Sequence, residues 1–135
     1  KNAALHWYTN AANLGSNKAE YLIGMLMKNE GQGLFAHSEI TNWFEKAASK
    51  GYIPAYFQTS KMYFDSPKYQ KVENWGEREL AKSYLWLSAT IKRSPIKGEV
   101  EQAEKMLVEV LEVMPESWIP DLNQTLKSHF TEIAK

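Results

Sequence analysis

A nine-residue phrase that occurs twice is the feature that most constrains how this chain folds. Residues 7–15 read WYTNAANLG, and residues 43–51, thirty-six positions later, read WFEKAASKG. In both copies an aromatic pair is followed by an alanine pair and then by a glycine. Self-similarity at a period of about 20–50 residues is the signature of stacked structural repeats. The phrase therefore predicts an architecture built from similar helix pairs.

The register of the two copies extends beyond the phrase, with small residues aligned to small ones and aromatic residues to aromatic ones. The aligned pairs are Trp7 with Trp43, Tyr8 with Phe44, Ala11 with Ala47, Ala12 with Ala48, Gly15 with Gly51, Ala19 with Ala55, Tyr21 with Phe57, Gly24 with Ser60 and Leu26 with Met62. Closely packed helices need this alternation, because a small residue on one helix admits the ring of its neighbour. We expect structural roles at these positions, and at Trp86 in the weaker third phrase SYLWLSAT.

Apolar residues recur at spacings of three and four along the chain, which predicts an all-α fold. We expect about seven helices, over residues 4–12, 18–29, 38–50, 54–65, 80–91, 100–114 and 118–133. Asn17 and Glu20 are interpreted as a capping box, and Ser38 as the cap of the third helix. Residues 65–76 are expected to form a long loop.

Two segments resemble Sel1-like repeats, which are relatives of the tetratricopeptide repeat. They are ALHWYTNAANLGSNKAEYLIGMLMKNEGQG and WFEKAASKGYIPAYFQTSKMY. The family pattern is an alanine, an aromatic pair, an alanine pair, a glycine, an alanine, a leucine–glycine step and a Gly-x-Gly loop. The first segment carries it at Ala4, Trp7-Tyr8, Ala11-Ala12, Gly15, Ala19, Ile23-Gly24 and Gly31-Gln32-Gly33. The second segment departs from the pattern at Ile40 and Ser60, and it lacks the Gly-x-Gly loop.

The resemblance implies one α-solenoid domain over residues 1–135. Within it, 3–36 and 37–75 are two repeat units, 76–92 is a degenerate third unit and 93–135 holds C-terminal capping helices. The chain opens in mid-repeat, so we expect it to be the C-terminal part of a longer repeat protein. We also expect the first helix to expose apolar surface, and copies to self-associate or the helix to fray at that cut end.

The balance of charges argues against nucleic-acid binding. Sixteen lysines and arginines offset sixteen aspartates and glutamates, so no basic excess can neutralise phosphates. No apolar run approaches the roughly 20 residues that span a bilayer, so we expect no membrane insertion. Cysteine is absent, which removes disulfides, thiol nucleophiles and zinc knuckles.

No group of residues has the spacing of a chemical site. His6, His37 and His129 stand far apart, without the spacing of metal ligands. The sequence holds no P-loop, dinucleotide fingerprint or Gly-x-Ser-x-Gly motif, and its glutamates show no sign of a catalytic cleft. We therefore expect no enzymatic activity, no metal and no cofactor.

Two features outside the repeat register allow more than one interpretation. Trp75 and Trp118 are interpreted as surface or junction residues, with packing against the cap as the favoured role. From Glu99 to Glu116 there are six glutamates and one lysine. A solvated face of the cap is the favoured interpretation of that stretch, and a docking face for a basic partner, with Glu101, Glu109 and Glu112, is the alternative.

As a family, Sel1-like repeat proteins are adaptors in eukaryotic quality control and in bacterial envelope and signalling assemblies. The resemblance therefore implies a protein–protein interaction scaffold in which the first helix of each pair lines a concave face. The residues expected to face a protein or peptide partner are Leu22, Met25, Asn29, Gln58, Lys61 and Asp65. Their mixture of apolar, amide and charged groups suits an extended peptide.

A bacterial cell-wall-associated accessory or enzyme-like binding module is the alternative function. Some bacterial relatives are linked to cell-wall compounds, but they carry paired cysteines in each repeat, and this chain has none. The resemblance leans slightly toward the bacterial envelope or periplasm over the cytoplasm, and the sequence itself does not reveal the compartment.

Overall fold

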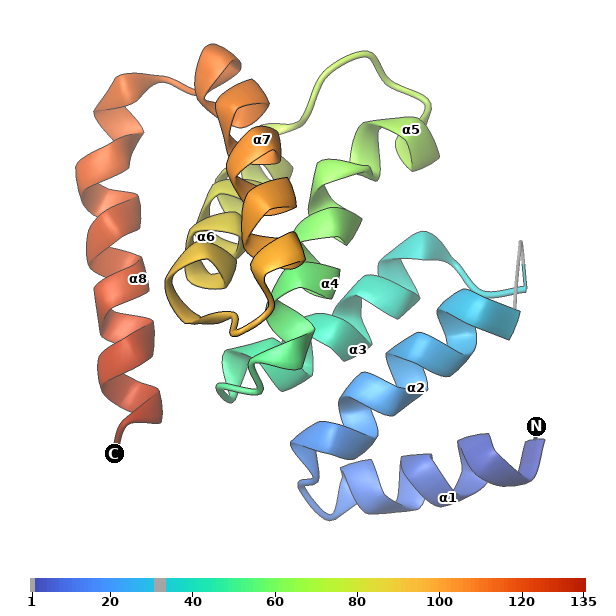
Figure 1. Cartoon of the computed structure of the whole chain (residues 1–135). Coiled ribbons are helices and arrows are strands. Elements are labelled where there is room, and N and C mark those ends of the chain that lie inside the picture. The colour runs from blue at the N-terminus through green and yellow to red at the C-terminus, as the bar shows by residue number, and fades with distance from the viewer. Residues whose placement is uncertain (1, 31–33) are drawn as a thin grey trace.

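The computed structural model describes residues 2–30 and 34–135 (Figure 1). Within this part of the chain every regular element is helical and none is a strand, so the all-α prediction is confirmed. The α-helices are α1 (Asn2–Asn13), α2 (Asn17–Glu30), α3 (His37–Ser49), α4 (Pro54–Phe64), α5 (Ser66–Gln70), α6 (Glu77–Arg93), α7 (Lys97–Val113) and α8 (Ile119–Ile133). A short 3-10 helix, η1 (Glu116–Trp118), leads directly into α8.

The described residues form eight α-helices, one more than the prediction of about seven. The additional helix is α5, which lies inside the predicted loop at 65–76. Its five residues are too few to display a helical period, so the apolar pattern held no signal for it. In the remaining loop, Trp75 packs its ring on Phe64 and donates its Nε1–H to the Phe64 carbonyl at 2.9 Å.

Helices that follow one another in the chain pack against one another for most of its length. The contacting pairs are α1 with α2, α2 with α3, α3 with α4, α4 with α6, and α6 with α7 (Figure 1). The last helix departs from this order, because α8 packs mainly on α6. Its Ile133 also lies against the turn at Gly51, where an added Cβ would stand 3.0 Å away. The final helix therefore covers α6 and the end of α3.

The small residues of the register lie where helices approach closely. Ala19, Ala55 and Ser60 are buried, with at most 4% of their surface exposed. A Cβ added at Gly24 of α2 would stand 2.7 Å from the ring of Phe44 in α3, and Phe44 is fully buried. The missing side chain at this position is what lets the ring of the next helix approach the backbone of α2.

Both copies of the repeated phrase end in the left-handed backbone conformation that favours glycine. The φ angle is 95° at Gly15 and 93° at Gly51, so each glycine ends its helix in the predicted way. The Gly-x-Gly loop at 31–33, part of the family resemblance, lies outside the described residues.

The predicted capping box at the start of α2 is wrong. Asn17 is the first helical residue, and the capping bond comes from Ser16, whose Oγ accepts from the Ala19 N–H at 3.1 Å. Glu20 is 1% exposed, and its Oε2 accepts from the Lys50 ammonium at 2.9 Å. The Glu20 carboxylate therefore pairs with Lys50 at the end of α3 and does not form the capping box.

At the other helix starts, the predicted cap of α3 is absent, whereas the prolines occupy positions that suit them. The third helix begins at His37, one residue before the expected cap, so the prediction for Ser38 is also wrong. Pro54 and Pro120 stand in the first turns of α4 and α8, where a missing N–H leaves no helical hydrogen bond unmade.

Candidate functional site

The six residues predicted to face a partner lie on α2 and α4, and we call their surface the α2–α4 face. Leu22, Met25, Gln58 and Lys61 are partly buried, whereas Asn29 and Asp65 are exposed. The Lys61 ammonium lies 5.1 Å from the centre of the Phe57 ring, which holds the lysine against α4. The face therefore offers half-covered side chains of mixed polarity to the solvent.

Lys28 joins the two helices at this face, and the sequence analysis missed it. Its Nζ donates a hydrogen bond to Gln58 Oε1 at 2.9 Å. Burial lowers the pKa of Lys28, the charge of Lys61 lowers it further, and Asp65 acts in the opposite direction. These four side chains therefore share one electrostatic neighbourhood. The repeat register held no signal for Lys28, because the position thirty-six residues later is Phe64.

Residues at the beginning of α2 contact residues at the end of α3 and just after it. The rings of Tyr21 and Tyr52 lie 5.4 Å apart, beside the ion pair of Glu20 with Lys50. Burial raises the pKa of Tyr21, with smaller contributions from Tyr52 and from Glu99 at the start of α7. Because α7 also packs against α4, it borders the α2–α4 face.

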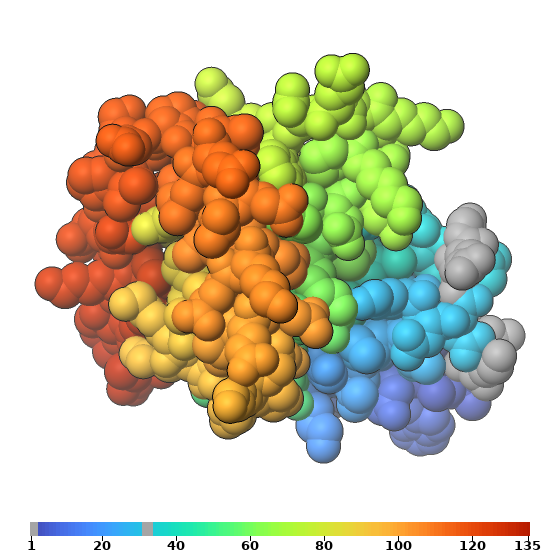
Figure 2. Space-filling view, turned by 45° about the horizontal axis from the view of Figure 1, so that its top comes forward, coloured from blue at the N-terminus to red at the C-terminus, as the bar shows by residue number. Residues whose placement is uncertain are grey.

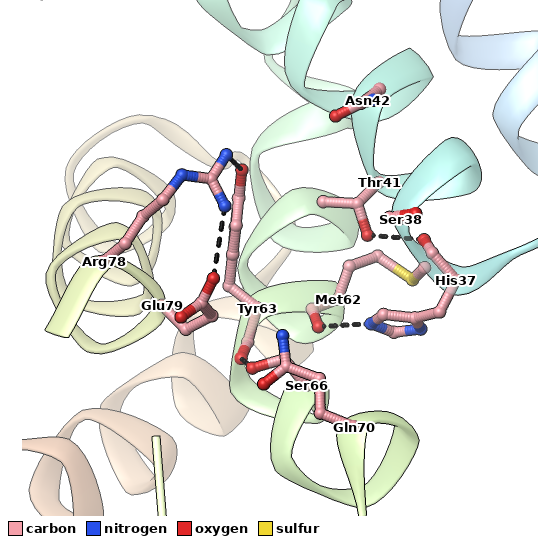
Figure 3. Close-up of a pocket in the computed structure, with 10 residues that line it drawn as sticks. All are labelled: His37, Ser38, Thr41, Asn42, Met62, Tyr63, Ser66, Gln70, Arg78 and Glu79. Carbon is pink, nitrogen blue, oxygen red and sulfur yellow. Dashed lines mark hydrogen bonds and ion pairs between the residues drawn. The ribbon is translucent and has the colours of Figure 1, made fainter. Parts of the chain in front are cut away.

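A small pocket opens where α3, α4, α5 and α6 meet (Figure 3). Arg78 reaches over the Tyr63 ring and donates from Nη2 to the Tyr63 hydroxyl at 3.3 Å. On the other side, His37 Nε2 bonds the Met62 carbonyl at 2.8 Å. The volume is about 60 Å³, the space of about two waters at roughly 30 Å³ each. The pocket is too small for an organic ligand.

Next to Tyr63, the Glu45 carboxylate of α3 accepts hydrogen bonds from side chains of α4 and α6. Its Oε1 accepts from the Tyr63 hydroxyl, and its Oε2 accepts from Lys82 at 2.8 Å and from the Trp86 indole at 2.9 Å. Burial by itself raises the pKa of Glu45, but these three hydrogen bonds outweigh it and hold the pKa below its ordinary value. Burial and the bond to Glu45 raise the pKa of Tyr63. The carboxylate of Glu45 therefore links three helices through its hydrogen bonds.

The tryptophans differ in burial. Trp86 is 7% exposed, Trp43 is partly buried beneath the Lys46 ammonium, and Trp7 is 70% exposed. The register predicts that Trp43 is buried between neighbouring helices, but Trp43 is only partly buried, and its neighbour Phe44 occupies the interior. The exposure of Trp7 departs from the packing role of the register and fits the apolar surface expected on the first helix. Trp118, outside the register, packs on the core around α6 and α7.

The three histidines make separate contacts. His6 bonds Asn10 at 3.3 Å, and His129 Nε2 bonds the Tyr56 hydroxyl at 2.9 Å. Burial and the charge of Arg93 lower the pKa of His129. Over residues 2–30 and 34–135, no group of three or more histidine, aspartate or glutamate side chains could hold a metal ion.

No helix in the described part of the chain is long and apolar enough to cross a membrane. Comparison of the chain with protein-family models, with curated proteins and with solved structures found no match. The resemblance to Sel1-like repeats accordingly rests on the repeated residues themselves.

Proposed function

We propose that this chain is an interaction scaffold built from Sel1-like repeats, and that a peptide segment of a partner protein binds along the α2–α4 face. One observation carries the proposal. Leu22, Met25 and Asn29 stand thirty-six residues before Gln58, Lys61 and Asp65. The hydrogen bond from Lys28 to Gln58 holds together the two helices that carry these sets. Helical-repeat proteins bind their partners on a surface that equivalent positions of successive units form together.

The chemistry of the face favours an extended peptide. The Gln58 carbonyl accepts from Lys28, which leaves the Gln58 amide N–H groups to donate to a peptide carbonyl. The exposed Asn29 offers a second amide, and Met25 offers apolar surface beside it. The ammonium groups of Lys28 and Lys61 lie close enough to interact electrostatically, so an acidic side chain on the peptide adds a favourable contact.

The experiment is affinity capture from native lysate, followed by calorimetry with the purified partner. The test variant replaces Asn29, Gln58 and Lys61 together by alanine. We expect its affinity to fall at least tenfold, while its free energy of unfolding stays within about 1 kcal/mol of the wild-type value because these side chains reach solvent. A matched control replaces Asn10, Gln124 and Lys135 by alanine, which are exposed residues of the same three types away from the face.

The control should bind as the wild type does. Equal affinity of all three proteins would overturn the proposal, as would equal weakening of both variants. A screen of cell-wall fragments by thermal shift covers the alternative function. A fragment that stabilises the wild type and not the test variant would favour a small-ligand module over a protein scaffold.

A further inference from the structure

A groove between α6 and α8 lies apart from the α2–α4 face. Its volume is about 1040 Å³, at the upper end of the range for binding clefts. All three charged residues that line it are basic, namely Lys92, Arg93 and Lys127. Within the described part of the chain, none of these three forms an ion pair. The groove therefore carries positive charge that no ion pair within the described residues neutralises.

The groove also has an apolar floor, and a hydrogen bond joins α6 to α8 at one end. Leu126 is buried, and the Arg93 guanidinium lies 4.0 Å from the centre of the Phe130 ring. A guanidinium stacked on a ring keeps its edge N–H groups available to a carboxylate. At the other end, the Tyr84 hydroxyl donates to Asn123 Oδ1 at 2.6 Å. An occupant with apolar and acidic side chains fits this lining.

The outer face of α7 has the complementary character. Glu104, Glu109 and Glu112 are exposed, and no ion pair is formed by any of them within the described residues. Between them, Val108 is 57% exposed and Leu111 is 41% exposed. Figure 2 shows α7, in orange, at the surface of the molecule over much of its length. This face combines apolar side chains with carboxylates that lack a partner.

We propose that a second copy of this chain docks the outer face of its α7 in the α6–α8 groove. The lengths agree, because eight residues separate Tyr84 from Lys92 and eight separate Glu104 from Glu112, about 12 Å of helix in each case. Val108 and Leu111 lie over the apolar floor, and the glutamates meet the lysines and the arginine. The contact is heterologous, so copies add head to tail.

Sedimentation velocity over a concentration series tests whether the chain self-associates. At low ionic strength we expect the mean mass to rise with concentration. At about 1 M salt, where the Debye length is about 3 Å, we expect the monomer, because the contact depends on exposed charges. A wild-type chain that stays monomeric at every concentration and low salt would overturn the proposal.

Two charge-reversal variants identify the surfaces. The groove variant is Lys92→Glu with Lys127→Glu, and the helix variant is Glu104→Lys with Glu112→Lys. Each alone should remain monomeric, because its groove and its α7 face then carry charge of the same sign. An equal mixture should associate again, since the α7 face of each variant is complementary to the groove of the other. A matched control for the groove variant, Lys18→Glu with Lys71→Glu, lowers the net charge by the same amount at exposed sites elsewhere and should behave as the wild type does.

The mixture also guards against misfolding, because restored association requires both variants to be folded, and circular dichroism of each variant checks this directly. Folded variants whose mixture stays monomeric would overturn the pairing of these two surfaces. Association that persists in both single variants would place the contact elsewhere, for example at the exposed Trp7 and Leu14 of the first hairpin. The groove and helix variants leave the residues of the α2–α4 face unchanged, so partner capture with them tests the proposed function separately.

Discussion

Three tryptophans occupy equivalent places in the repeated phrase and its weaker echo, yet they lie in different surroundings. Trp7 is 70% exposed, Trp43 is partly buried and Trp86 is 7% exposed. The number of helices around each explains the series. Among the main helix contacts, α1 has only α2 as a neighbour, α3 lies between α2 and α4, and α6 contacts α4, α7 and α8.

The repeated phrase specifies the local backbone structure, whereas the neighbouring helices determine how deeply each tryptophan is buried. The phrase sets the helical register and the left-handed turn, which both copies share at Gly15 and Gly51. Burial depends on how many helices cover the site. Tyr8 is partly buried, whereas its counterpart Phe44 is fully buried. The same residue type at the same register position therefore contributes differently to stability along the chain.

The largest expected effect is at Trp86. Trp86→Ala should lower the free energy of unfolding by about 3–5 kcal/mol, because it leaves a cavity and removes a hydrogen bond to Glu45. Trp7→Ala is the matched control and should change it by less than about 0.5 kcal/mol. Urea denaturation of both variants measures the difference. Similar losses in the two proteins would mean that covering neighbours do not set the contribution of the tryptophan.

The next effect is at Glu45, where three helices meet. Glu45→Gln should cost about 1–3 kcal/mol at neutral pH, because charged hydrogen bonds to Lys82 and Trp86 are weakened. The pKa of Glu45 is lowered in the folded state, so its contribution is complete above the ordinary pKa of 4.5 and is lost as pH falls through the lower folded value.

Chemical denaturation between pH 7 and acid pH checks this linkage. The wild type should lose more stability than Glu45→Gln as the pH falls below about 4.5. Parallel pH profiles for the two proteins would show that the folded carboxylate is not preferentially ionised. The exposed Glu39 of the same helix serves as a control, and Glu39→Gln should change the free energy of unfolding at neutral pH by less than about 0.5 kcal/mol.

A smaller effect is expected at Gly24, beneath the Phe44 ring. Gly24→Ala places a Cβ 2.7 Å from ring carbons, and such overpacking costs about 1–3 kcal/mol. The higher helix propensity of alanine returns close to 1 kcal/mol, so we expect a net loss of about 1–2 kcal/mol. Phe44→Leu should cost less in the Gly24→Ala background than in the wild type, as a double-mutant cycle would measure. Strict additivity would mean that the two sites do not touch.

The repeated phrase made the helical class and the close approach at Gly24 predictable, because both are local consequences of spacing and side-chain size. Contacts between distant side chains were not predictable in this way. The contacts of Lys28 with Gln58 and of Glu20 with Lys50 depend on how the α1–α2 pair of helices packs on the α3–α4 pair. The apolar pattern of a single helix does not encode that packing. A long-range partner for Glu20 also explains why the predicted capping box is absent.

Of the two candidate binding surfaces, one was predictable from the sequence and the other was not. The repeat register predicted the α2–α4 face, because equivalent positions of successive repeat units are expected to share a side of the molecule. It held no signal for the α6–α8 groove, since α8 follows no repeat phrase and packs on α6 out of chain order. Its basic lining comes from residues that are unremarkable in the sequence, such as Lys92 and Lys127, and only the packing brings them together.

Native-state hydrogen exchange of the two alanine pairs tests the central claim most directly, because both copies of the phrase are measured in one molecule. Ala47 and Ala48 are fully buried in a core cluster with residues of α4, α6 and α8, so their amides should exchange only through opening close to global unfolding. Ala11 and Ala12, on the helix with a single main neighbour, should exchange at least a hundredfold faster through local opening of α1. Equal protection of the two pairs would contradict the account, because the phrase alone would then determine stability.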